Sequence, residues 1–400
     1  MITESSGHKH LPITFILSTC LFLIGISAAG ITPYRAIVAI DNLGMSNSLY
    51  ALVMTLGSIG TALASLVMGN LADKLSDRRL LVMMSALMGA LAYGLIYLIP
   101  TQFVYILSIC VILPFGGALF SQTFSFSRVY YNHHQPERAE FMVSFLRTLF
   151  SVAWVVIPPI AGWVASRYSV YNVFASAAVA HLLFTLFFGL LLREPSTKIG
   201  TASQKTEQDG GKVHLPVFRL IGIVGVLFVR VAILLHLTVI PLALINDFGG
   251  TLATVGLNAS IAAGLEIPFM LLWGWAASRL TKESILSVNA SLFALYLFLL
   301  FNAHSVREVL WLQGLNAIAT AALLSITISY MQESIKGRVG LSTSLMDVLT
   351  VVASLISATV FAAISDEQNY IRVFFAASLI SFAGAAIIYL SRSLKPEKAT

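Results

Sequence analysis

Twelve long apolar runs, separated by short polar stretches, determine what this chain can fold into. Apolar residues make up 58% of its 400 residues and charged residues only 10%, whereas about a quarter of the residues of a soluble domain are charged. A helix needs about 20 apolar residues to cross a bilayer. The runs therefore leave no room for a large soluble domain, which excludes a receptor with a large ectodomain and an ATPase carrying its own nucleotide-binding domain.

We expect one membrane-spanning helix in each run, which makes the chain an all-α membrane protein. The predicted spans are 13–34, 48–69, 80–99, 103–126, 140–165, 171–192, 217–245, 252–274, 284–302, 307–329, 339–364 and 370–391. They predict an N-terminal six-helix half over residues 1–192, a polar linker over 193–216 and a C-terminal six-helix half over 217–400. The N-terminus carries no cleavable-signal pattern, so we expect the first span to be retained.

The Lys and Arg residues are distributed unevenly between the two sides that this topology creates. Eighteen of the 24 fall on the side that holds both termini, four on the opposite side, and two, Arg147 and Arg230, inside spans. Cytoplasmic loops carry an excess of Lys and Arg, so both termini are expected in the cytoplasm. The net charge of +6 reflects this topology and gives no reason to expect a nucleic-acid partner.

The two halves resemble each other in sequence. A shift of 200 residues places Arg147 on Asp347, and a shift of 205 places Gly69 on Gly274 in the loop after the second span of each half. Two parallel six-helix halves joined by a cytoplasmic linker are typical of transporters that alternate access around a central cavity.

The loop after the second span carries the most specific motif, GNLADKLSDRR from Gly69 to Arg79. It resembles the signature of the major facilitator superfamily between its second and third helices, with Ser76 in place of a glycine and an additional acidic residue before the arginines. Gly69 allows close helix approach, and the resemblance implies that Asp73 caps the eleventh helix. Arg78 and Arg79 are expected to bind carboxylates and carbonyls nearby. We predict a gating role for Gly69, Asp73 and Arg78.

Within that superfamily the chain resembles the bacterial sugar efflux transporters. The resemblance lies in Thr32-Pro33 and in segments 144–159, 264–268, 312–318 and 332–337. Ile157 departs from it, because it stands where that family has the glycine of a Gly-Pro-Pro sequence. The resemblance implies the major facilitator fold, a location in the lipid of the bacterial inner membrane, and a sugar or related small polar metabolite as substrate.

Four ionisable residues inside the predicted spans are candidates for function, because a charge in the bilayer is costly unless it faces a cavity or a partner. Arg147 and Asp347 lie at matching depths, while Arg230 and Glu266 lie near the middle of their spans. A carboxylate that is protonated when the cavity changes sides would couple proton entry to substrate exit. We expect Glu266 to be that group, because Pro268 distorts its helix and admits water. Asp347 is second, and Arg230, on an adjacent helix, is the third residue predicted to take part in coupling. A structural ion pair between Arg230 and Glu266 is the alternative.

Substrate binding is predicted at polar and aromatic side chains within the spans. An amide that faced lipid would be unsatisfied, so Gln122, Gln313 and Asn316 are expected to point inward and bind sugar hydroxyls. Arg147 is expected to hold a hydroxyl or an acidic group of the substrate, with a structural contact between helices as the alternative. Trp154 is expected to stack against the C–H face of a sugar, with helix packing as the alternative.

Backbone chemistry adds two gating candidates, Pro158 and Pro159, which must bend the fifth helix. The sequence contains no metal-binding or nucleotide-binding motif, so neither a metal nor a cofactor is expected. A membrane-embedded enzyme is disfavoured because the H-E-x-x-H and G-x-S-x-G patterns are missing. The closest alternative is a proton antiporter of drugs or other small metabolites. A uniporter and a non-transporting sensor also stay open, and two self-sufficient halves predict a monomer.

Overall fold

A computed structural model describes residues 12–74, 77–198, 216–334, 339–366 and 369–393. Twelve helical segments of the described chain are long and apolar enough to cross a membrane. Their order agrees with the predicted one, and outside the first and fourth spans their boundaries lie close to the predicted ones. The all-α membrane fold with twelve spans is therefore confirmed. The main helices are α1 (Ile13–Ile31), α3 (Asn47–Lys74), α4 (Arg78–Leu98), α7 (Leu119–His134), α8 (Ala139–Arg167), α9 (Tyr171–Leu190), α10 (Val217–Asn246), α11 (Leu252–Ala276), α12 (Lys282–Phe301), α13 (Val306–Ser334), α14 (Val339–Ile364) and α15 (Ile371–Ser393).

The first span is longer than predicted, because the helix continues past Thr32-Pro33. Pro33 lies at the start of the 3-10 turn η1 (Thr32–Tyr34), so the helix changes type at the residue that lacks an N–H. The chain continues through α2 (Arg35–Ile37) and η2 (Val38–Asn42). The span therefore extends to Asn42 instead of ending at residue 34 as predicted, and Arg35, one of the four basic residues counted on the opposite side, lies inside it.

The fourth span is also continuous and longer than predicted. It runs through α5 (Gln102–Leu107), the π-helical η3 (Ser108–Ile112) and α6 (Leu113–Gly117) into α7. Pro114 occupies the first turn of α6, where a proline is tolerated. The predicted range 103–126 already ran through Pro114, and the structure extends that span to His134.

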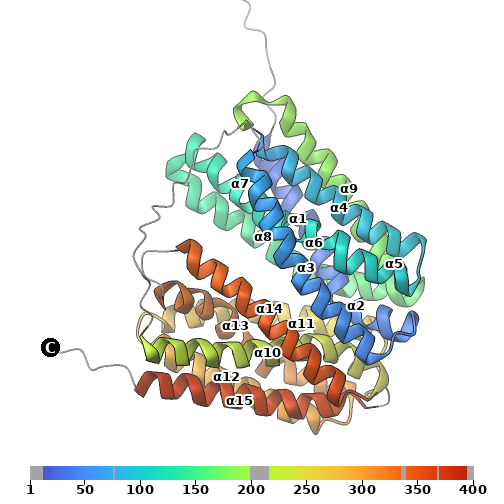
Figure 1. Cartoon of the computed structure of the whole chain (residues 1–400), viewed down its shortest axis with the longest axis vertical. Helices are drawn as coiled ribbons and strands as arrows, with labels where there is room; N and C mark the ends of the chain where they lie inside the picture. The colour runs from blue at the N-terminus through green and yellow to red at the C-terminus, as the bar shows by residue number, and fades with distance from the viewer. Residues whose placement is uncertain (1–11, 75–76, 199–215, 335–338, 367–368, 394–400) are drawn as a thin grey trace, which may run out of the picture.

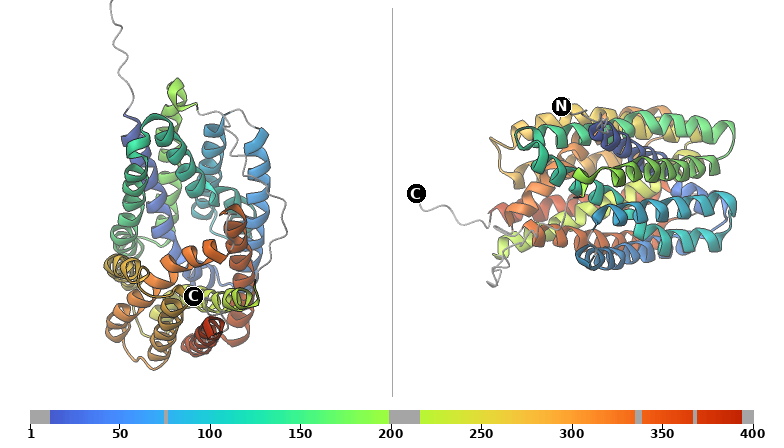
Figure 2. Two further views of the ribbon diagram at one scale, coloured as in Figure 1. Left: turned by 90° about the vertical axis from the view of Figure 1, so that its left-hand side faces the viewer. Right: turned by 90° about the horizontal axis from the view of Figure 1, so that it is seen from above.

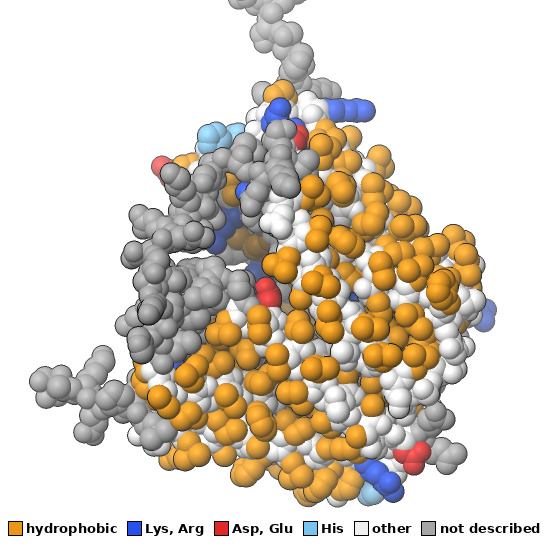
Figure 3. Space-filling model, viewed as in Figure 1, with side chains coloured by type: hydrophobic (Ala, Val, Ile, Leu, Met, Phe, Trp, Pro, Cys, Tyr) orange, Lys and Arg blue, Asp and Glu red, His pale blue; other side chains and the backbone are white. Residues whose placement is uncertain are grey.

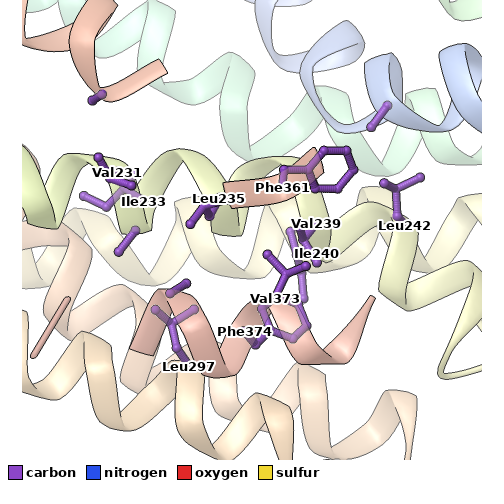
Figure 4. Close-up of a cluster of buried hydrophobic side chains, with 14 of the residues drawn as sticks. Val231, Ile233, Leu235, Val239, Ile240, Leu242, Leu297, Phe361, Val373 and Phe374 are labelled. Atoms are coloured by element: carbon purple, nitrogen blue, oxygen red, sulfur yellow. The ribbon is translucent and has the colours of Figure 1, made fainter. Parts of the chain in front are cut away.

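The helices form two bundles, α1–α9 and α10–α15, which converge at one end and diverge at the other (Figures 1 and 2). One cluster of buried apolar side chains runs through both bundles, from Tyr34 and Tyr50 to Phe361 and Phe374. Figure 4 shows its C-terminal part, where Val231 and other side chains of α10 meet those of α12, α14 and α15. A second cluster, which includes Phe184, lies within α1–α9 alone.

Matching turns join the first and second spans of each bundle. Gly44 and Gly249 both have a φ of +66°, a conformation that glycine adopts without strain. They are 205 residues apart, and the same shift relates Gly69 to Gly274. We therefore use this shift to compare equivalent positions in the first two spans of each half.

Candidate functional site

Hydrogen bonds between the two bundles gather around these turns, at what we call the closed end. Tyr34 Oη donates to the backbone oxygen of Leu252 at 3.1 Å. Tyr370 Oη donates to Asn47 Oδ1 at 3.3 Å. These residues lie at the ends of their helices that are remote from Ile13, so the bundles are tied together at the end opposite the start of the first span.

The contact of α8 with α11 depends on the two prolines of α8. Pro159 has no N–H, so the carbonyl of Val155, four residues earlier, has no donor in its own helix. Ser260 Oγ of α11 donates to that carbonyl instead. Beside it, a Cβ atom added to Gly256 would lie 2.1 Å from the Pro158 carbonyl oxygen, so the helices can approach this closely only with glycine there. Pro159 thus leaves a backbone acceptor in α8 to which a side chain of the opposite half donates a hydrogen bond.

The equivalent contact of α3 with α14 uses side chains alone. Ser58 Oγ donates to Ser354 Oγ at 2.7 Å, and the aromatic rings of Tyr50 and Phe361 lie edge to face with their centroids 6.3 Å apart. Both pairs of helices are therefore in contact in their closed-end portions.

Arg147 and Asp347 face the space between the bundles at the other, open end. Helix residues spaced by four, seven or eleven share a face, so Arg147 and Ser151 lie on the same face of α8 as Pro158. Asp347 lies two turns before Ser354 on the α14 face that contacts α3. Both charged side chains are exposed. Figure 3 shows the surface hollowed between the bundles, with basic and acidic side chains on its wall.

The Glu266 carboxyl contacts α13. Thr320 Oγ1 donates to Glu266 Oε1 at 2.6 Å, and Trp273, two turns later in α11, donates from Nε1 to the Ile318 carbonyl oxygen at 2.9 Å. Within the described chain, neither of the two ion pairs shorter than 4 Å includes Glu266 or Arg230. The buried Nε of Arg230 has no hydrogen-bond partner among those residues. The ion pair considered between Arg230 and Glu266 is therefore not formed.

The three amides predicted to bind substrate are engaged inside the bundles. Gln122 Oε1 accepts a hydrogen bond from Ser85 Oγ at 3.0 Å. Gln313 is fully buried and donates to Tyr296 Oη at 3.0 Å, while Asn316 donates to Gln313 Oε1 at 2.8 Å. In this conformation the exposed wall presents Arg147 rather than these amides, and their role in binding stays a prediction.

The other predicted residues are placed less distinctively. Trp154 is half-buried on α8. The backbones of Gly69 and Asp73 lie in the last turns of α3. The Asp73 side chain is outside the described part of the chain. Arg78 begins α4, and its buried Nε has no hydrogen-bond partner among the described residues. Their gating roles stay predictions.

Arg79 makes the contacts with a carboxylate and with carbonyls that were expected of the two arginines of this motif. Asp77 accepts a hydrogen bond from the Arg79 backbone N–H at 3.0 Å, which caps α4, and the two side chains form an ion pair of 2.6 Å. The Arg79 guanidinium holds the pKa of the Asp77 carboxyl below its usual range. Arg79 Nη1 also donates to the Leu191 carbonyl oxygen and to Thr197 Oγ1, which fastens the chain after α9 to the start of α4.

Sequence reasoning missed several residues that the structure brings together. Ser260, Thr320 and Tyr370 are small or common side chains within apolar runs, and only the register between helices shows their partners. Pro159 was a usable signal, because it predicts a free carbonyl at Val155. No described cluster of three or more His, Cys, Asp or Glu residues could hold a metal ion.

Comparison with known proteins identifies the family. The sequence profile of the Major Facilitator Superfamily matches residues 17–237 and 223–400, which together include most of the chain. The chain belongs to the Major Facilitator Superfamily. It is therefore a multi-pass transporter rather than an enzyme.

Curated relatives and solved structures agree with this membership. The chain is 28% identical to Sugar efflux transporter C of Escherichia coli, over 92% of this chain and 93% of that protein. It is also 28% identical to Sugar efflux transporter A of Dickeya chrysanthemi, over 92% of each chain. The peptide transporter POT in complex with sulfate shares the fold with a TM-score of 0.75 at 14% identity, covering 95% of this chain and 94% of that one. The nucleoside transporter NupG does so with a TM-score of 0.73 at 13% identity, covering 97% and 100%.

Proposed function

We propose that this Major Facilitator Superfamily member exports a sugar or related small polar metabolite across the bacterial inner membrane. The two halves, residues 1–192 and 217–400, alternate access to the space between them, and protons move inward as substrate moves out. The protein acts as a monomer, with residues 193–216 as the cytoplasmic connection.

The observation that carries the substrate class is the similarity to two sugar efflux transporters over more than nine-tenths of the chain. The exposed wall adds chemistry suited to a polyhydroxy compound. Arg147 donates hydrogen bonds in a planar array, Asp347 accepts them, and Ser151 lies one turn from Arg147 on the same helix face.

The orientation follows from the uneven distribution of Lys and Arg, which favours cytoplasmic termini. In that orientation the closed end, with Tyr34, Asn47 and Tyr370, faces outward, and the open end faces the cytoplasm. The conformation is then the one that loads substrate for export, because its cavity is open on the side where the substrate is made.

Proton coupling is assigned to Glu266, with Asp347 as the second carboxylate. Glu266 is half-buried in the middle of α11 and has a hydroxyl partner rather than an ion-pair partner. A carboxylate in such a setting changes its proton occupancy when water or neighbouring dipoles change, which is the requirement for coupling to the conformation.

The decisive experiment is transport by the purified protein in proteoliposomes with an imposed pH gradient, across a panel of sugars, amino acids and cationic dyes. We expect saturable sugar flux that increases with the gradient. Glu266→Gln should abolish that increase, and Asp347→Asn should weaken it. Glu308→Gln, an exposed closed-end carboxylate, is the matched control and should behave as the wild type. Transport of dyes alone would refute the sugar assignment, and gradient-independent flux that Glu266→Gln leaves unchanged would refute the coupling.

A further inference from the structure

The Thr320 hydroxyl lies between two acceptors. Its Oγ1 is 2.6 Å from Glu266 Oε1 on α11 and 2.8 Å from the backbone oxygen of Asn316, one turn earlier in α13. A hydroxyl carries one proton and two lone pairs. It can therefore donate to only one of these oxygens fully at a time, and which one receives the proton depends on the state of the carboxyl group.

No charged side chain in the described part of the chain forms an ion pair with Glu266. Helix α11 contains no other ionisable residue and packs mainly against α8 and α13, with smaller contacts to α10 and η1. The ionisable residues of those elements are Tyr34, Glu140, Arg147, Arg167, Arg219, Arg230, His236, Arg307, Glu308, Tyr330 and Glu333. In the described chain, no ion pair shorter than 4 Å joins any of them to Glu266. Thr320 is thus the polar side chain that the Glu266 carboxyl contacts.

The two protonation states of Glu266 require opposite behaviour from that partner. An ionised carboxylate only accepts, so Thr320 then donates to Oε1. A protonated carboxyl has an O–H of its own, which can donate to Thr320 Oγ1 while the Thr320 proton turns to the Asn316 carbonyl. The added proton comes from water and stays on Glu266. Thr320 keeps its own proton and only rotates about its C–O bond.

A buried network holds the Thr320 segment in place. Asn316 Nδ2 donates to Gln313 Oε1 at 2.8 Å, and Gln313 Nε2 donates to Tyr296 Oη at 3.0 Å. The same Tyr296 oxygen lies 2.9 Å from His236 Nε2 of α10. Three helices, α10, α12 and α13, therefore fix the turn of α13 that presents both Thr320 and its alternative acceptor. A hydroxyl on a fixed backbone selects between two acceptors by rotation alone.

We infer that Thr320 is a positioning residue for Glu266, whose hydroxyl sets the pH range in which that carboxyl exchanges its proton. This inference rests on the proposed function, in which Glu266 takes up the coupled proton. A hydrogen bond to a charged group is strong enough to change a titration midpoint by about one pH unit. Loss of the Thr320 hydroxyl destabilises the ionised form of Glu266 more than its protonated form. The pH at which half of Glu266 is protonated should therefore rise.

The test compares Thr320→Val, which keeps the shape and loses the hydroxyl, with Thr320→Ser, which keeps the hydroxyl. Thr327→Val is the matched control, because the Thr327 hydroxyl on the same helix donates to the Leu323 carbonyl of that helix. In full-length protein in proteoliposomes, the pH profile of sugar export should move upward by about one unit in Thr320→Val. It should stay in place in Thr320→Ser and Thr327→Val.

A second readout separates this inference from the transport proposal. The infrared C=O band of protonated Glu266, identified by its loss in Glu266→Gln, reports the titration in the purified protein without transport. A midpoint that rises in Thr320→Val alone supports the inference. Equal midpoints in wild type and Thr320→Val, or equal shifts in Thr320→Val and Thr320→Ser, overturn it. A shifted midpoint together with gradient-independent transport supports the positioning of Glu266 and overturns the proposed coupling.

Discussion

The two halves have the same helix order and opposite chemistry at equivalent positions. A shift of 205 residues places Gly25 on Arg230 and Thr61 on Glu266. In the N-terminal half, Gly25 allows α1 to pack against α8, and the Thr61 hydroxyl donates to the Gly57 carbonyl of its own helix at 2.8 Å. In the C-terminal half, both positions carry ionisable groups. At these positions one half therefore packs, whereas the other carries Arg230 and Glu266, of which Glu266 is the carboxylate proposed for coupling.

The contacts between halves differ in the same way. A shift of 200 residues places Pro159 on Thr359 and Val155 on Leu355. Thr359 keeps its N–H, and its hydroxyl donates to the Leu355 carbonyl at 2.9 Å, so α14 offers no free carbonyl there. The α8–α11 contact uses a backbone acceptor, whereas the α3–α14 contact uses two serine hydroxyls. The two interfaces should therefore respond differently to equivalent substitutions.

The largest difference is expected between Gly25→Leu and Arg230→Leu. A Cβ at Gly25 would lie 2.5 Å from the Ala153 Cβ, so the larger side chain should lower the stability of the fold by about 2–3 kcal/mol. Arg230→Leu removes a partly buried cation whose Nε has no hydrogen-bond partner among the described residues. This substitution should change stability by less than about 1 kcal/mol. Thermal unfolding in detergent measures both. Equal losses would show that the C-terminal half packs as tightly at this position.

A smaller effect on stability is expected for a substitution at Asp247, in the turn after the first span of the C-terminal half. The equivalent residue of the N-terminal half is Asn42. Asp247 accepts the Tyr370 backbone N–H at 3.0 Å, and partial burial raises its pKa from 3.8 to about 6. Because the pKa of Asp247 is higher in the folded protein than in the unfolded chain, ionisation of this carboxyl lowers the stability of the fold. The loss of stability is complete above about pH 6 and absent below the pKa of the unfolded chain. Asp247→Asn should therefore stabilise the protein by about 1 kcal/mol at pH 8, after allowance for solvent exposure.

The pH dependence provides the control for that variant. The stability difference between Asp247→Asn and wild type should decline as the pH falls through 6 and disappear near pH 4, as followed by unfolding at several pH values. A constant difference would mean that the side-chain shape, and not the charge, is responsible. Asn42→Asp should produce the reverse trend if the two turns are equivalent.

The smallest effect is expected for Ser260→Ala. Hydrogen bonds between membrane helices contribute about 0.6 kcal/mol on average, so the closed end should open about threefold more often. Spin labels placed across the α8–α11 contact would measure the populations. Ser151→Ala, whose hydroxyl donates to the Arg147 carbonyl of the same helix, is the matched control. In a Pro159→Ala background the Val155 carbonyl regains a helical donor, so Ser260→Ala should then have no further effect.

The fold could be predicted from the sequence because span length and apolar composition are local properties. The end of the first span was predicted wrongly because a proline often ends a helix. At Pro33 the helix changes to a 3-10 turn and continues. The site was predicted less well. An amide such as Gln313 must be satisfied at membrane depth, but the sequence cannot tell a cavity from an internal partner. Tyr296 is that partner, and it comes from another helix.

The free carbonyl of Val155 also determines what opening the closed end requires. Backbone hydrogen bonds inside a helix cannot be exchanged without unwinding it, but this oxygen accepts its hydrogen bond from Ser260 of the opposite half. When the halves separate there, a single water molecule can occupy the position of the serine hydroxyl. In the proposed alternating-access cycle, hydration would then replace a protein contact one for one, and opening would not require the helix to unwind.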